Sequence, residues 1–141
     1  MSSHHLARDL EIARSQAVDR LLPDLDLHEL GLVREIYIEG DVWDRWSSTM
    51  EFKVACRREG KDYLLTVVFR SIRKAVLPNL DPTFMFEELE IEDVSKDSLE
   101  GIRFRAEDLG KTGFEVFCES IEFTDCVLLA DGSESGSVGC R

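Results

Sequence analysis

The sequence predicts an α+β fold that is mainly β, with one N-terminal helix packed on an antiparallel meander. The meander has six to seven strands and forms either a curled sheet or a small sandwich. Three observations support this: a helical spacing of apolar residues near the N-terminus, a period of two after Gly31, and turn signals at intervals of about ten residues. With 141 residues, 43% of them hydrophobic, the chain is expected to form a single domain over 1–130, followed by a disordered tail over 131–141.

The predicted helix covers residues 6–22. Its apolar residues recur at spacings of three and four, which places them on one stripe: Leu6, Leu10, Ala13, Ala17 and Leu21. Pro23 follows and disfavours helical geometry at the residue before it. A narrow stripe of Leu and Ala is expected to pack against a sheet.

The strands are predicted over about 32–128. Met50, Phe52 and Val54 alternate with charged residues, which indicates a strand with one solvated face. A polar, glycine-containing connection over 58–62 predicts a hairpin. The returning strand, 63–69, is apolar on both faces and is expected to be central.

The segment 71–82 fits neither period and contains two prolines, so we expect an irregular crossover there. Alternation resumes in three further segments, 88–92, 102–106 and 114–123. The last two are separated by a second hairpin loop over 108–113.

The charge balance limits the kinds of partner. Asp and Glu number 29 against 17 Lys and Arg, a formal net charge of −12. Nucleic acid and anionic membrane would both repel such a chain, so neither is an expected partner. The charge favours a basic protein partner or serves solubility alone. No apolar run reaches the length of about 18 residues typical of a membrane span, and no signal peptide is recognised, so a cytoplasmic location is expected.

The sequence contains no motif for catalysis, metal binding or a cofactor. The four cysteines form no CxxC pair and are expected to be free thiols, of which Cys140 lies in the tail. His28 follows Pro23 and could pair with Asp26 or Glu29, although a surface or capping histidine is the favoured interpretation, because no candidate nucleophile lies in a recognisable motif. The chain is therefore not expected to be an enzyme.

The segment 81–100 concentrates acidic residues. Glu88, Glu90 and Glu92 are predicted to point the same way along one strand, about 6–7 Å apart. This ridge of charge is interpreted either as a solvated strand face or as a recognition surface for a basic partner.

Two tryptophans lie in a polar, acidic loop before the strand that begins near Met50. Trp43 and Trp46 are flanked by Asp41 and Asp44. Tryptophan is enriched among the residues that anchor interfaces. The loop is therefore a second candidate contact region, unless both rings pack under it into the core.

Two stretches carry a family resemblance. Residues 26–36 resemble a short His-acid entry into a first strand, and residues 113–123 resemble an aromatic–Cys–Ile closing strand. Together they make the span 25–123 similar to small acidic bacterial immunity-type proteins of polymorphic-toxin systems and to related domains of unknown role. The resemblance implies a shared fold, a toxin domain as partner and a toxin gene next to the gene for this chain.

The leading hypothesis is a non-enzymatic protein-binding domain of the immunity type, which neutralises a basic toxin through an acidic face. The residues expected to contact the partner are Asp41, Trp43, Asp44, Trp46, Glu88, Glu90 and Glu92. One alternative is a structural or assembly domain, possibly homodimeric, that is acidic for solubility only. The other is a small-molecule-binding β-domain that uses His28.

Overall fold

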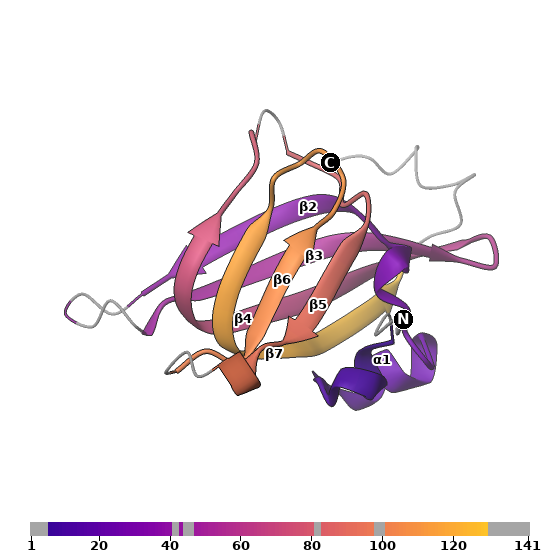
Figure 1. Ribbon diagram of the computed structural model, residues 1–141. Coiled ribbons are helices and arrows are strands. Elements are labelled where there is room, and N and C mark those ends of the chain that lie inside the picture. Colours follow the sequence, from indigo (N-terminus) through magenta and orange to yellow (C-terminus); the bar gives the residue numbers. More distant parts are fainter. Residues whose placement is uncertain (1–5, 41–42, 44–46, 81–82, 98–100, 130–141) are drawn as a thin grey trace.

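The computed structural model describes residues 6–40, 43, 47–80, 83–97 and 101–129. In these residues the chain is mainly β, as predicted, and forms one seven-stranded sheet (Figure 1). The strands are β1 (Ala13–Arg14), β2 (Leu30–Glu39), β3 (Thr49–Arg58), β4 (Lys61–Val76), β5 (Leu89–Asp93), β6 (Phe104–Asp108) and β7 (Glu115–Leu128). The short helices are η1 (Ala7–Leu10), α1 (Gln16–Leu21), η2 (Leu27–Glu29) and η4 (Ser95–Asp97).

Six of the seven strands form two antiparallel three-stranded meanders, and β1 pairs with β7 in parallel. The strand order of the sheet is β2-β3-β4-β7-β6-β5, so the meanders meet where β4 pairs with β7. In Figure 1, β5 and β6 lie in front of β2, β3 and β4, because the sheet curls around its own inner face. An isolated bridge between Leu32 and Met85 brings the segment before β5 against β2. Of the two predicted forms, the fold is therefore the curled sheet.

Phenylalanine fills the inside of the curled sheet. Phe52 and Phe69 come from the first meander. Phe84 and Phe86 precede the second meander, and Phe114 lies in its connection between β6 and β7. The rings of Phe52 and Phe114 have centroids 5.7 Å apart, and those of Phe86 and Phe114 are 5.1 Å apart, both edge to face. Burial of these rings from both meanders holds the curl together.

A helix is present in the N-terminal segment, but it is much shorter than the predicted 6–22. Glu11 takes a left-handed conformation that ends η1, and the following residues pair with β7 as β1. The backbone then restarts as α1, where Ser15 Oγ accepts a hydrogen bond from the N–H of Val18. Pairing with the sheet thus overrides the helical spacing. The buried residues of the segment differ from the predicted stripe: Ala7, Leu10, Ile12, Val18 and Leu22.

The connection from β4 is also more regular than predicted. β4 continues to Val76, so the first half of the expected crossover 71–82 is strand. Ser71 has a φ of 55°, and the register against β7 shifts between Ile72 and Lys74. This irregularity hides the strand period in the sequence. The hairpin between β3 and β4 is confirmed, with Glu59 and Gly60 both at positive φ in a two-residue turn.

Three of the cysteines are buried free thiols, as predicted. Burial raises the pKa of Cys56 and of Cys118 to about 12 and that of Cys126 to about 11. Cys140 and the predicted tail lie outside the described residues. Among the described residues, no helix combines the length and apolar character that crossing a membrane requires.

Candidate functional site

The outer side of β5, β6 and β7 carries a row of carboxylates. Glu90 on β5 pairs directly with Glu107 on β6, and Glu107 pairs with Glu115 on β7. Their inward neighbours are buried, so all three side chains share the outer side of the sheet. Glu92 extends this group along β5, and Glu88 extends it just before that strand begins. We call these five residues the acidic face.

One cation stands in the middle of the acidic face. The Arg105 guanidinium lies 2.9 Å from a carboxylate oxygen of Glu107 and 2.9 Å from one of Glu115, with Glu92 at 3.8 Å. The hydrogen bond to Glu115 and the charges of Glu107 and Glu92 raise the pKa of Arg105. Among these described side chains, one guanidinium is set against five carboxylates, which leaves an excess of negative charge within the group.

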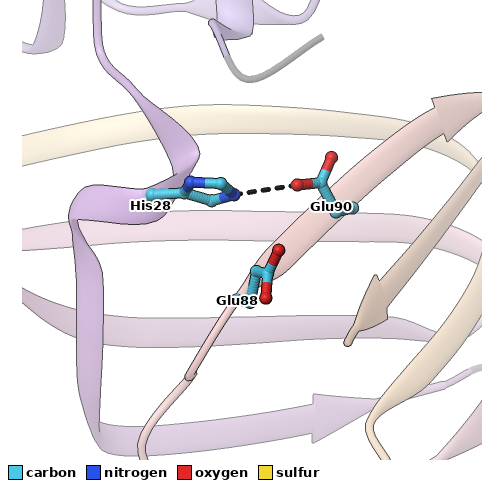
Figure 2. Close-up of side chains that lie close together, drawn as sticks. All are labelled: His28, Glu88 and Glu90. Carbon is cyan, nitrogen blue, oxygen red and sulfur yellow. Dashed lines mark hydrogen bonds and ion pairs between the residues drawn. The ribbon is translucent and has the colours of Figure 1, made fainter. Parts of the chain in front are cut away.

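A histidine from a distant segment meets the same face at its β5 edge. His28 Nε2 lies 2.8 Å from Oε2 of Glu90, across 62 residues of sequence. Figure 2 shows the imidazole of η2 turned toward Glu90 and Glu88, which lie along one chain segment. The nitrogen and the nearest oxygens of these three side chains all fall within 4.8 Å of one another. The group combines one imidazole with two carboxylates.

The segment that bears His28 is held by capping interactions and an ion pair. Asp26 Oδ1 accepts a hydrogen bond from the N–H of His28, and Glu29 Oε1 accepts one from the N–H of Asp26. Glu29 also forms a two-pronged ion pair with Arg58 of β3, at 2.8 and 2.5 Å. Hydrogen bonding to Glu29 raises the pKa of Arg58. The His28 backbone is thereby anchored to the sheet.

The segment that bears Glu88 is held by a buried carboxylate. Asp108 is 4% exposed and accepts hydrogen bonds from the N–H groups of Glu87 and Glu88, at 3.1 and 2.7 Å. Thr112 and the N–H of Gly110 also donate to it. Burial alone would raise the pKa of Asp108, but these hydrogen bonds outweigh burial and lower it. Asp108 therefore stays ionised and fixes the start of β5.

The structure assembles the predicted site residues only in part. Glu90 and Glu92 share one side of β5, whereas Glu88 lies just before this strand and places its carboxylate near that of Glu90. His28 pairs with Glu90, however, because the carboxylates of Asp26 and Glu29 are used for capping and for Arg58.

Of the four candidate residues in the predicted tryptophan loop, the structure describes Trp43 alone. Trp43 is 92% exposed and follows β2, which is at the other end of the strand order from β5. It is therefore not packed into the core. Asp41, Asp44 and Trp46 lie outside the described residues.

Sequence reasoning missed Glu107 and Glu115. Alternation over 102–106 places Arg105 on the side opposite Phe104 and Ala106, and the same period could have placed Glu107 beside it. That these residues line up with Glu90 depends on the register of three strands, which alternation does not specify.

Comparison with known proteins identifies no relative of this chain. The chain matches no protein-family model, and no curated protein or solved structure is significantly similar to it. The candidate function is therefore argued from the geometry of the acidic face.

Proposed function

We propose that this chain is a non-enzymatic protein-binding domain that docks a basic surface of a partner protein against the acidic face. The observation that carries the proposal is the row in which Glu90, Glu107 and Glu115 lie directly opposite one another on adjacent strands. Like charges at directly opposed positions of a sheet destabilise it. Cations supplied by a partner would remove that repulsion on binding.

The presentation of the charges also suits recognition. The side chains of Glu90, Glu107 and Glu115 are 25%, 34% and 23% exposed, so they reach solvent from a rigid sheet. Charges held on strands lose little freedom on binding and can orient a partner before contact. Complementary charge accelerates association and makes it sensitive to salt.

The cysteine thiols support a role without nucleophilic chemistry. Cys56, Cys118 and Cys126 are buried and their pKa values are raised, so they are poor nucleophiles at neutral pH. The resemblance to immunity-type proteins makes a basic toxin domain the first partner to test.

The test measures binding of toxin domains encoded beside the gene, by biolayer interferometry at low and high salt. The face variant is Glu90→Gln with Glu107→Gln and Glu115→Gln. A matched control removes the same charge elsewhere, with Glu39→Gln, Glu51→Gln and Glu59→Gln. We expect the face variant to lose affinity by at least about tenfold and the control by less than about threefold.

Two results would reject the proposal. One is the failure of every basic candidate to form a complex at low salt. The other is equal loss of affinity in the face variant and the control, because the effect would then follow net charge alone. Light scattering on the free protein adds a check, since a stable dimer that the face variant dissociates would assign the acidic face to self-association.

A further inference from the structure

We infer that His28, Glu88 and Glu90 form a binding site for a divalent first-row transition metal ion, such as Zn²⁺. This inference goes beyond protein binding and does not depend on it. It rests on three donor groups of the types that Zn²⁺ prefers, drawn from two segments of the chain (Figure 2). An imidazole nitrogen and two carboxylate oxygens supply three ligands, and water would complete the coordination.

The donor atoms are close to the spacing that a metal requires. Zinc bonds of about 2.0–2.1 Å in a tetrahedral arrangement place neighbouring ligand atoms about 3.3 Å apart. His28 Nε2 and Glu90 Oε2 are now 2.8 Å apart, and the widest separation in the group is within 4.8 Å. An ion would replace the proton between His28 and Glu90. The adjustment needed at Glu88 is within reach of side-chain rotation, because this side chain is exposed.

Glu88 is the residue that an ion pair alone does not explain. A hydrogen bond between Nε2 and Oε2 joins His28 to Glu90. Glu88 adds a second carboxylate beside it. Within the described part of the chain, the Glu88 carboxylate has no cationic side chain within ion-pair distance. Two neighbouring carboxylates with one imidazole repel each other, and a divalent cation would relieve that repulsion.

Both segments of the site are fixed before any ion arrives. The Asp26–Glu29 capping box and the ion pair with Arg58 hold the backbone of His28. Asp108 holds the backbone of Glu88 from the other side. Metal sites gain affinity when the groups behind the ligands restrict their positions, so this support favours binding.

The donor set also selects the class of metal. Ca²⁺ and Mg²⁺ prefer oxygen ligands alone and larger numbers of them. Imidazole favours Zn²⁺, Co²⁺, Ni²⁺ and Cu²⁺ among the divalent ions. We therefore expect Zn²⁺ to bind and Mg²⁺ not to compete with it.

The experiment titrates ZnCl₂ into the full chain by calorimetry, and CoCl₂ by visible absorption, which reports nitrogen and oxygen coordination. Other candidate ligands are removed in a background variant that carries His4→Ala, His5→Ala and Cys140→Ser. In this background, Glu88→Gln is the main variant, because it leaves the hydrogen bond between His28 and Glu90 in place. His28→Gln is the second variant, and Glu92→Gln is the matched control on the same side of β5.

We expect Glu88→Gln and His28→Gln each to weaken Zn²⁺ binding by about tenfold or more, and Glu92→Gln by less than about twofold. Circular dichroism establishes that each variant is folded. The inference fails if the background does not bind Zn²⁺, if both ligand variants bind as well as the background, or if Mg²⁺ displaces Zn²⁺ at equal concentration. Because the titration contains no partner protein, its failure leaves the proposed protein-binding function untouched, and the reverse also holds.

Discussion

Glu107 and Asp108 are neighbours on β6, yet their carboxylates have opposite surroundings. Asp108 points inward, is almost fully buried and accepts hydrogen bonds from three backbone N–H groups and one hydroxyl. Glu107 points outward, between Glu90 and Glu115, and shares Arg105 with Glu115. On one short strand, the inward carboxylate is therefore buried and surrounded by hydrogen-bond donors, whereas the outward carboxylate lies beside other carboxylates.

The buried carboxylate of Asp108 stabilises the fold, whereas the carboxylates of the acidic face are accessible to solvent. A buried carboxylate is stable only when donors surround it, so Asp108 has no capacity left for a ligand. The carboxylates of the acidic face remain partly exposed to solvent. The inner side of the second meander thus maintains the fold, whereas the carboxylates of the outer side are partly exposed to solvent.

The largest expected effect tests the inner side. Phe114→Ala removes a ring that contacts Phe52, Phe69, Phe84 and Phe86. We expect the free energy of unfolding to fall by about 3–5 kcal/mol, because the change leaves a cavity between the two meanders. Urea denaturation measures the loss.

The control for this prediction is Phe117→Ala. Phe117 is on the outer side of β7, where it lies near Lys74 and Arg105. Its removal should cost about 1 kcal/mol, from lost cation–π contact and partial burial. If Phe114→Ala and Phe117→Ala lowered the free energy of unfolding equally, the inner side of the sheet would not contribute more to stability than the outer side.

A smaller effect is expected at the buried carboxylate. Asp108→Asn retains the shape of the side chain but replaces one acceptor oxygen with an NH₂ group, which faces backbone N–H donors. We expect the free energy of unfolding to fall by about 2–3 kcal/mol at neutral pH, because hydrogen bonds to a charged acceptor are lost. Urea denaturation at pH 7 measures it.

The stability that Asp108 contributes is expected to decrease at acidic pH. The folded state lowers the pKa of Asp108. Its contribution to stability is therefore present above the unfolded pKa, about 3.9, and is lost as the pH falls through the lower folded value. The difference in stability between the native chain and Asp108→Asn should shrink across that acidic range. Parallel curves for the two proteins would show that Asp108 does not titrate with a lowered pKa.

Much of this contrast could be predicted from local sequence. Alternation correctly places Glu90 and Glu92 on one side of β5, because a strand has a period of two. The turn at Glu59-Gly60 was equally visible, since glycine accepts positive φ without strain. These features depend on a few adjacent residues.

What could not be predicted depends on contacts between distant segments. His28 and Glu90 are 62 residues apart in sequence and meet only because η2 packs near β5. The opposition of Glu90, Glu107 and Glu115 is set by register, and a shift of one residue would have turned Glu107 inward. The short α1 has the same origin, because pairing of Ala13 and Arg14 with β7 replaces part of the expected helix.

The smallest expected change in stability tests the outer side most directly. Glu107→Gln removes a charge from the centre of the row, which relieves the repulsion between this residue and its neighbours Glu90 and Glu115. The same change weakens the interaction of residue 107 with Arg105, although Arg105 keeps its ion pair with Glu115. These effects oppose each other, so the free energy of unfolding should change by less than about 0.5 kcal/mol and should rise slightly at low salt. Urea denaturation at low and high salt measures both values.

The opposite variant, Arg105→Gln, removes the cation and leaves the row intact. Repulsion among Glu92, Glu107 and Glu115 is then no longer offset, so we expect a loss of about 1 kcal/mol at low salt that shrinks as salt is added. If Glu107→Gln and Arg105→Gln lower stability alike and without dependence on salt, then repulsion in the row is negligible. The strain that a basic partner is proposed to relieve would not exist, and the acidic face would serve solubility alone.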